Sequence, residues 1–485
     1  MTKFEWKKLS KLTCHYNRRD ELIMSQLTPR YVVNELNKYI IGQDEAKRAI
    51  AIALRNRLRR LKLEPAMQAE VKPKNILMIG PTGVGKTEIA RRLAEIANAP
   101  FVKVEATKYT EIGYVGRDVE AMVRDLVEAS IRMVKKIKHQ EVREEAYERA
   151  LTRLAKALKP GIKQEKKQQA QPNDFMAMLQ QMTQSQEEPQ EVVTDDIKVS
   201  RRQIKEQLRQ GLINDKEVTI ELEEKKLQLN NLNPMMEQMM DVQSEFQNLR
   251  PKKKIKRSVT VKEALELLTE EESDHLVNQD DINQQALELA QNSGIIFIDE
   301  IDKIATSSNH GGEVSRQGVQ RDILPIVEGS DIQTKYGIIS TDHILFIGSG
   351  AFHVAKPSDL IPELQGRFPI RVQLTDLKVD DFRRILQEPA HAILHQYQAM
   401  LATEGVEVIF TDSAIDKMAE YAVLLNESTD NIGARRLHTI VETVLEELLY
   451  EAADMNMGRI EINGAYVSQR LDKIVESPDL SHYIL

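Results

Sequence analysis

One eight-residue segment restricts the fold of this chain more than any other. Residues 80–87 are Gly-Pro-Thr-Gly-Val-Gly-Lys-Thr. A short apolar run, 75–79, precedes this segment, and apolar residues recur at helical spacing from Glu88 to Ala97 after it. A strand, a glycine-rich loop and a helix in this order predict an α/β sheet whose loop binds phosphate groups.

Each residue type in this loop suits the binding of a nucleoside triphosphate. Glycines let main-chain N–H groups approach phosphate oxygens, and the start of the following helix adds its positive dipole end. Lys86 is expected to reach the β- and γ-phosphates of ATP, and the Thr87 hydroxyl to coordinate Mg²⁺. The predicted nucleotide-binding residues of this segment are Gly83, Val84, Gly85, Lys86, Thr87 and Glu88.

A second apolar run, 294–298, ends in the acidic pair Asp299-Glu300. Parallel strands end at one edge of a sheet, so this pair is expected beside the loop. Asp299 would hold Mg²⁺ through its water shell, and Glu300 would orient and polarise the attacking water as general base. Two acids after an apolar strand are more often only a polar strand end, but together with residues 80–87 they predict ATP hydrolysis.

The distance between these two motifs predicts an insertion. Lys86 and Asp299 are 213 positions apart (299 minus 86). The stretch 133–284 is rich in Gln, Glu and Lys and carries methionine clusters within 176–182 and 235–240. We expect an inserted, mostly helical domain here.

The remainder of the chain divides around this insertion. A third apolar run, 343–348, is followed by Ser349, a candidate for a polar sensor residue that hydrogen-bonds a water. Long amphipathic helices are predicted over 381–402 and 433–453, with a short β-like segment, 406–410, between them. The predicted organisation is an N-terminal extension 1–24, a nucleotide-binding domain 25–132 and 285–374, the insertion 133–284, and a C-terminal helical domain 375–485.

Composition excludes several classes of protein. The hydrophobic fraction is 41% and the charged fraction 29%, which is typical of soluble globular domains. No stretch approaches the roughly 20 apolar residues that span a bilayer, and a net charge of −8 offers no overall basic surface for nucleic acid. The single cysteine, Cys14, cannot form an intramolecular disulfide. We therefore expect a cytoplasmic protein that binds neither membrane nor nucleic acid.

Further motifs resemble the AAA+ ATPases of the Clp/Hsp100 group, and within it the HslU (ClpY) family. They are Tyr39-Ile-Ile-Gly-Gln43, Gly113-Tyr-Val-Gly116, Pro362-Glu-Leu-Gln-Gly-Arg367, Gly433-Ala-Arg-Arg436 and Leu480-Ser-His-Tyr-Ile-Leu485. The related ClpX proteins carry a Cys-ligated zinc domain, which one cysteine cannot supply. The resemblance implies an AAA+ P-loop NTPase with a parallel sheet, an inserted mostly helical domain and a C-terminal α-helical domain.

The resemblance also implies roles at the nucleotide. Ile41 would pack on the adenine, although plain core packing is an alternative. Arg367 is similar to the arginine finger that a neighbouring subunit presents to the γ-phosphate, and Glu363 to a nucleotide-site contact. Arg435 resembles the sensor-2 arginine, and Arg436 beside it is the other candidate.

Two segments concern polypeptide partners. Tyr114 and Val115 stand between glycines and predict a mobile gripping loop, with an ordinary glycine-rich turn as the alternative. The apolar end, Tyr483, Ile484 and Leu485, suggests docking. The resemblance implies a ring of six subunits that unfolds proteins and threads them into an HslV-type peptidase, with unfolded or tagged proteins as substrates.

Two other functions use the same core. A nucleic-acid remodelling motor would favour a basic channel loop, whereas Tyr114 and Val115 are uncharged. A scaffold with an inactive site conflicts with the intact Lys86, Asp299 and Glu300.

Overall fold

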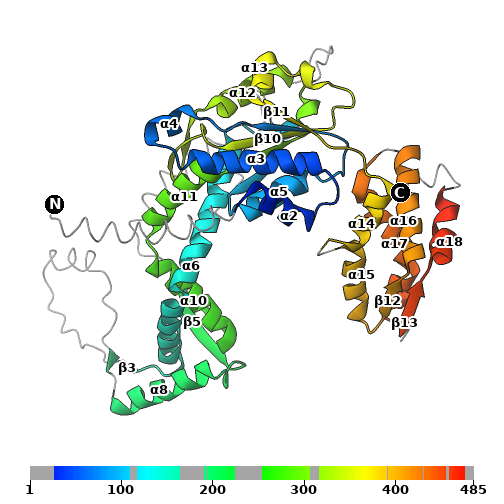
Figure 1. The fold of residues 1–485 in the computed structure, drawn as a ribbon. Coiled ribbons are helices and arrows are strands. Elements are labelled where there is room, and N and C mark those ends of the chain that lie inside the picture. The colour runs from blue at the N-terminus through cyan, green and yellow to red at the C-terminus, as the bar shows by residue number, and fades with distance from the viewer. Residues whose placement is uncertain are drawn as a thin grey trace. The chain divides into compact units, whose positions relative to one another are not determined.

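The computed structural model describes residues 27–109, 117–163, 191–192, 194–223, 254–305, 316–389, 392–429, 431–454 and 458–475. The chain divides into two compact units, which are described separately below. The first consists of Met1–Met133 and Asn283–Leu485, and the second of Val134–Ile282. Figure 1 labels many of the elements of both units.

A five-stranded parallel sheet forms the centre of the first unit (Figure 1). Its strands are β1 (Ile76–Ile79), β2 (Phe101–Glu105), β7 (Ile295–Asp299), β10 (Leu345–Gly350) and β11 (Ile370–Gln373), in the order β11-β1-β10-β7-β2. All four pairings are parallel. The predicted α/β class with a parallel sheet is therefore confirmed, and the structure adds β2 and β11, which the hydrophobic runs did not indicate.

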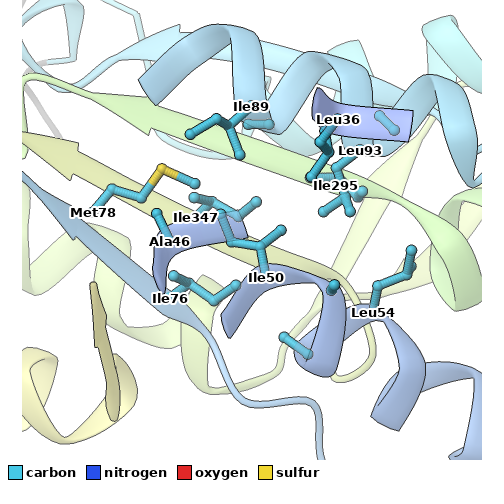
Figure 2. Close-up of a cluster of buried hydrophobic side chains, with 14 of the residues drawn as sticks. Leu36, Ala46, Ile50, Leu54, Ile76, Met78, Ile89, Leu93, Ile295 and Ile347 are labelled. Atoms are coloured by element: carbon cyan, nitrogen blue, oxygen red, sulfur yellow. The ribbon is translucent and has the colours of Figure 1, made fainter. Parts of the chain in front are cut away.

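Three helices pack on one face of this sheet: α2 (Pro29–Asn37), α3 (Asp44–Arg60) and α5 (Lys86–Ile96). Figure 2 shows how their apolar side chains meet those of the strands. The contacting residues include Leu36, Ile50, Leu54, Ile89, Leu93, Ile76, Met78, Ile295 and Ile347. Each such side chain contributes about 1.5–3 kcal/mol on full burial. Alternate strand residues such as Leu77, Ile296 and Phe346 are also buried, so both faces of the sheet are covered.

Local sequence explains where the first of these helices begins. Thr28 precedes α2, and its side-chain oxygen accepts a hydrogen bond from the main-chain N–H of Tyr31 at 3.2 Å. Pro29 occupies the first helical position, where no N–H is needed.

The other elements of the nucleotide-binding part connect the strands. They are α4 (Pro65–Glu70), η1 (Ala106–Lys108), the start of α6 (Ala121–Leu158), α11 (Gln279–Ser293), η2 (Ile301–Lys303), α12 (Arg316–Glu328), the hairpin β8 (Asp331–Thr334) and β9 (Gly337–Ser340), η3 (Pro357–Asp359) and α13 (Pro362–Arg367).

The C-terminal part of the first unit has its own hydrophobic core, which includes Phe382, Leu386, Met418 and Leu445. Its elements are α14 (Val379–Gln387), α15 (Ile393–Ala402), β12 (Glu407–Phe410), α16 (Asp412–Ser428), η4 (Gly433–Arg435), α17 (Arg436–Glu451), β13 (Arg459–Ile462) and α18 (Gly464–Val475). Strands β12 and β13 pair in parallel.

The prediction of one helix over 381–402 was wrong. Helix α14 ends at Gln387, Pro389 follows, and α15 begins at Ile393. Proline lacks the N–H that a helix interior needs, and it disfavours helical geometry in the residue before it. The amphipathic spacing continues across this break, because both helices pack against the same core.

The second unit combines helices with antiparallel strands. Its described elements are the part of α6 from Val134, β3 (Ile162–Lys163), β4 (Glu191–Val192), α8 (Asp195–Arg209), β5 (Glu217–Glu223), β6 (Lys254–Thr260) and α10 (Val261–Leu276). Leu151, Ile220 and Leu268 belong to its core. The seven-residue pairing of β5 with β6 was not predicted. The methionine clusters within 176–182 and 235–240 lie outside the described residues.

A buried arginine of α3 ties two strands of the first unit together. Arg57 donates hydrogen bonds to the carbonyl oxygens of Gly294 at 2.9 Å and His343 at 2.6 Å, just before β7 and β10. Burial lowers the pKa of Arg57 to about 9, which leaves it charged at neutral pH. The neighbouring Arg60 contacts the Nε2 atom of His343 at 2.6 Å.

This cluster makes stability depend on pH. Burial and the nearby Arg60 lower the pKa of His343 below 6.5. The unfolded chain therefore takes up this proton at a higher pH than the folded chain, and stability falls as pH drops through about 6.5. Each unit of pKa difference is worth about 1.4 kcal/mol.

We expect His343→Gln to reduce the loss of thermal stability between about pH 7.5 and 5.5. Glutamine keeps an acceptor for Arg60 but cannot take up a proton. The midpoint of thermal unfolding, measured across this pH range, checks the prediction. His395→Gln, at an exposed histidine, is the matched control. An unchanged pH dependence in His343→Gln would contradict it.

Candidate functional site

The glycine-rich loop connects β1 to α5, as its sequence predicted. Gly83 and Gly85 have φ values of 75° and 97°, in the left-handed region that favours glycine. Lys86 begins α5, so the loop lies at the N-terminus of this helix. The N-terminal end of a helix presents unpaired N–H groups and a positive dipole, both of which attract phosphate.

A turn of the C-terminal part lies against this loop, backbone to backbone. A Cβ atom on Gly83 would stand 1.9 Å from the carbonyl oxygen of Ile432, and one on Gly433 would stand 2.6 Å from that of Thr82. The N–H of Ala434 donates a hydrogen bond to the carbonyl of Gly83 at 3.1 Å. Only glycine at both positions allows this approach, which brings Arg435 to the loop.

Lys86 folds back over its own loop. Its Nζ atom donates to the carbonyl oxygens of Gly80 at 2.5 Å and Pro81 at 2.6 Å. Burial lowers the pKa of Lys86, and the nearby Arg435 lowers it further, while Asp299 and Asp302 act in the opposite direction. A negatively charged ligand beside Lys86 would favour its ammonium form.

Asp299 ends β7 at the same edge of the sheet. One of its carboxylate oxygens, Oδ1, accepts a hydrogen bond from the hydroxyl of Ser349 at 3.0 Å. The other, Oδ2, pairs with the ammonium of Lys103 at 3.0 Å. Ser349, a candidate for the polar sensor residue, is fully buried and contacts Asp299 directly.

Glu300 has an unusual main-chain conformation and a specific side-chain partner. Its φ of 58° lies in the left-handed region, which costs a non-glycine residue free energy and is common at functional sites. The hydroxyl of Thr107 donates to its Oε2 atom at 3.0 Å. Thr107 therefore fixes one orientation of the Glu300 carboxylate.

These elements enclose a cavity of about 620 Å³. Of the predicted residues, it is lined by Ile41, Gly83, Val84, Gly85, Lys86, Thr87, Glu88, Asp299, Glu300 and Arg435. Tyr39, Ile41 and Leu377 give it apolar wall surface, and the loop and acidic pair give it polar surface. Such a cavity suits a ligand with a flat apolar end and a charged end.

One of these residues is engaged elsewhere. The carboxylate of Glu88 pairs with Arg91 at 2.6 Å and Arg92 at 2.8 Å on its own helix. The guanidinium of Arg92 also lies 3.7 Å from the centre of the Tyr39 ring. Glu88 thus helps to hold Arg92 against a wall of the cavity.

The two candidate arginines of η4 and α17 separate clearly. Arg435 is exposed and lines the cavity. Arg436 is buried and donates hydrogen bonds to Asn426 at 3.4 Å and Thr429 at 2.7 Å. Only Arg435 faces the predicted nucleotide.

Two predicted residues lie away from the cavity. Arg367 ends α13, and its guanidinium pairs with Glu328 at 2.8 Å beside a different hollow of about 180 Å³. Glu363 is exposed on α13 and does not line the cavity. The structure therefore does not bring Arg367 or Glu363 to the loop of their own chain.

The predicted gripping residues Tyr114 and Val115 lie outside the described residues, as do Tyr483, Ile484 and Leu485. Their roles remain predictions.

Lys103 and Thr107, which contact the acidic pair, were not among the predicted site residues. Lys103 lies on β2 and Thr107 follows it in η1. Pairing of β2 with β7 brings Glu105 opposite Asp299 and so carries both neighbours to the acidic pair. No motif marks them, because their proximity depends on strand order alone.

The donor set fits Mg²⁺ and a nucleoside triphosphate. The Thr87 hydroxyl and the Asp299 carboxylate line one cavity, and Mg²⁺ prefers oxygen ligands of this kind. Ligand phosphates would lie between Lys86, Arg435 and the N-terminus of α5.

Comparison with protein families gives two matches. The model described as the AAA domain (Cdc48 subfamily) matches residues 215–371, and the ATPase family associated with various cellular activities (AAA) matches residues 76–194. Together with the relatives described next, these matches show that the chain is an ATPase.

Comparison with curated proteins gives relatives of nearly the same length. The ATP-dependent protease ATPase subunit HslU of Enterococcus faecalis is 61% identical over 94% of this chain and 99% of its own. The proteins of the same name from Ligilactobacillus salivarius and Halalkalibacterium halodurans are 56% and 54% identical, over 94% and 95% of this chain and 99% of their own.

Of the helices that the structure describes, none has both the length and the apolar character required to cross a membrane.

Substitution of the two arginines separates their roles. We expect Arg435→Ala to lower ATP turnover about ten-fold or more, because it removes a charge that faces the phosphates, and to leave the unfolding temperature unchanged. Arg436→Ala removes buried hydrogen bonds and should instead lower the unfolding temperature. Steady-state ATPase assays and thermal unfolding of both variants check this. The reverse assignment of effects would contradict it.

Proposed function

The chain belongs to the HslU family of ATP-dependent protease ATPase subunits, and we propose that it uses ATP hydrolysis to unfold proteins and thread them into an HslV-type peptidase. The observation that carries this proposal is the shared cavity of the phosphate loop, Asp299, Glu300 and Arg435. ATP hydrolysis therefore takes place beside the contact between the phosphate loop and the turn of the C-terminal part that carries Ala434. We place the protein in the cytoplasm, in contact with protein substrates.

Within the cavity, the residues divide the work. Lys86 and the N–H groups of the loop bind the phosphates, and Ile41 packs against the adenine. Thr87 would coordinate Mg²⁺ and Asp299 would hold it through its water shell, and the bound ion would neutralise charge on the phosphates. Glu300, oriented by Thr107, accepts a proton from the attacking water.

Arg367 acts on the nucleotide of a neighbouring chain. Arg367 lines a different hollow and does not reach the nucleotide cavity of its own chain. An arginine finger must reach a γ-phosphate, so the phosphate that Arg367 reaches belongs to a neighbouring chain. Glu363, on the same short helix, contacts that neighbouring site. A closed ring, which we propose to be a hexamer, supplies every site with one such finger.

Two predicted segments contact polypeptide partners, one the substrate and the other the peptidase. Tyr114 and Val115 grip an extended polypeptide through apolar contact, which requires no particular sequence. Tyr483, Ile484 and Leu485 dock the ring on the peptidase. None of these residues is basic, which favours a polypeptide substrate over nucleic acid, whose backbone requires a positively charged groove.

Reconstitution tests the whole proposal. We expect casein to be degraded only when this chain, an HslV-type peptidase and ATP are all present. Deletion of residues 480–485 should abolish the activation of the peptidase and leave ATP hydrolysis largely intact. Casein cleavage followed on gels, and phosphate release measured in parallel, check both statements. Activation that survives the deletion would show that the tail does not dock.

Substitution of the proposed general base tests the chemistry. Glu300→Gln should lower ATP turnover by about 100-fold or more and leave ATP bound, because the amide cannot accept the proton. Nucleotide retention during gel filtration and phosphate release measure the two effects. Glu105→Gln is the matched control, since Glu105 lies opposite Asp299 in the sheet but pairs with Lys108 at 3.1 Å. Turnover at the wild-type rate in Glu300→Gln would exclude this role.

A further inference from the structure

We propose that Glu328 and Asn75 are positioning residues for Arg367, which they hold ready for the nucleotide of the next subunit. The inference rests on the proposed action of Arg367 on a neighbouring chain. It concerns side-chain and main-chain contacts that lie outside the nucleotide cavity.

Glu328 holds one edge of the Arg367 guanidinium. The last residue of α12 is Glu328, and its Oε1 atom accepts from Nε of Arg367 at 2.9 Å and lies 2.8 Å from NH2. A guanidinium carries five N–H donors in a planar fork. Among the described residues, its NH1 nitrogen has no hydrogen-bond partner. The contact with Glu328 therefore sets the plane of the group and leaves the NH1 edge for an incoming phosphate.

Orientation is a better account of this pair than stability. The side chains of Arg367 and Glu328 are 45% and 38% exposed, and exposed ion pairs stabilise a fold only weakly. A free arginine side chain occupies many rotamers, whereas one held at its Nε edge occupies few. Restricting it before the phosphate arrives lowers the entropy lost on reaching the transition state.

Asn75 holds the main chain of the same residue. It is buried, and its Nδ2 atom donates to the carbonyl of Arg367 at 3.0 Å. Its Oδ1 atom accepts from the N–H of Phe346 on β10 at 3.1 Å. Asn75 directly precedes β1, so the backbone of Arg367 is attached to two strands of the central sheet.

Lys72 supports the other partner. Its ammonium donates to the carbonyl of Glu328 at 3.3 Å and pairs with Asp342 at 2.8 Å. The end of α12 that carries Glu328 is therefore fixed as well. One hollow of about 180 Å³ is lined by all five of these residues: Lys72, Asn75, Glu328, Asp342 and Arg367.

Rings assembled from two variant chains can show whether Glu328 positions Arg367 or only stabilises the fold. Chains with Glu300→Gln keep the finger but lack turnover at their own site. Chains with Arg367→Ala keep their own site but lack the finger. Each type alone should hydrolyse little ATP, and mixed rings should regain turnover at Arg367→Ala sites that face an intact finger.

Glu328→Ala is then added to one chain type at a time. Added to the Glu300→Gln chain, which supplies the finger, it should lower the regained turnover about two- to ten-fold. Added to the Arg367→Ala chain, it should change nothing, because no finger is present there to position. Glu328→Gln, which keeps an acceptor, should give a smaller loss in the first arrangement.

Glu388→Ala is the matched control, since Glu388 forms a similarly exposed pair with Nε of Arg384 at 2.9 Å and does not line the hollow; it should change nothing in either arrangement. Asn75→Asp keeps the acceptor for Phe346, replaces the donor to Arg367, and should show the same dependence on chain type as Glu328→Ala. Ring size by light scattering and the unfolding temperature confirm that each variant assembles.

Equal losses in both arrangements would overturn the proposal, because Glu328 would then act on the fold or on its own nucleotide site. Mixed rings of full size that regain no turnover before Glu328 is changed would instead overturn the action of Arg367 on a neighbour. The two failures are thus distinguishable.

Discussion

Main-chain hydrogen bonding between β1, β10 and β7 is the constraint on which the nucleotide site depends. In this register Ile79 lies opposite Gly350, and Ile298 lies opposite Gly348. The loop after β1, Ser349 and Asp299 therefore meet at one edge of the sheet, although 213 positions separate Lys86 from Asp299. The N–H of Gly80 also bonds the carbonyl of Gly350 at 3.2 Å, which joins the loop to β10 directly. The buried apolar residues between the sheet and α3 and α5 keep this register in place.

The contact between Gly83 and Gly433 adds the second part of the site. A side chain at either position would collide with main-chain carbonyls, so two glycines from distant motifs are required together. Their approach brings Arg435 to the cavity, and it directs the adjacent Arg436 into the C-terminal core. A displacement of the phosphate loop would therefore move the turn at Gly433 in the C-terminal part, which has its own hydrophobic core.

Strand β1 serves two sites through its two ends. Its carboxyl end leads into the phosphate loop, while Asn75, at its amino end, bonds the carbonyl of Arg367. Four residues of extended strand span only about 13 Å. In the proposed ring, one short strand therefore connects the nucleotide that a chain binds with the arginine that it offers to its neighbour.

The sequence by itself determined the fold class, the strand–loop–helix at residues 75–97, the acidic pair and the presence of an insertion. These features depend on local patterns: buried runs for parallel strands, glycines for the loop, and spacing along the chain. Ten of the residues that it selected line the cavity, because the motifs that carry them are short and contiguous.

Only the tertiary structure decided which of Arg435 and Arg436 faces the cavity, that Thr107 and Lys103 reach the acidic pair, and that Glu328 pairs with Arg367. It also ended the helix before Pro389, where the amphipathic spacing had suggested continuity. Each of these outcomes depends on strand order or on packing between residues far apart in the chain. The hydrophobic periodicity of a segment does not predict such pairings, since the same strand or helix pattern can pack beside more than one neighbouring element.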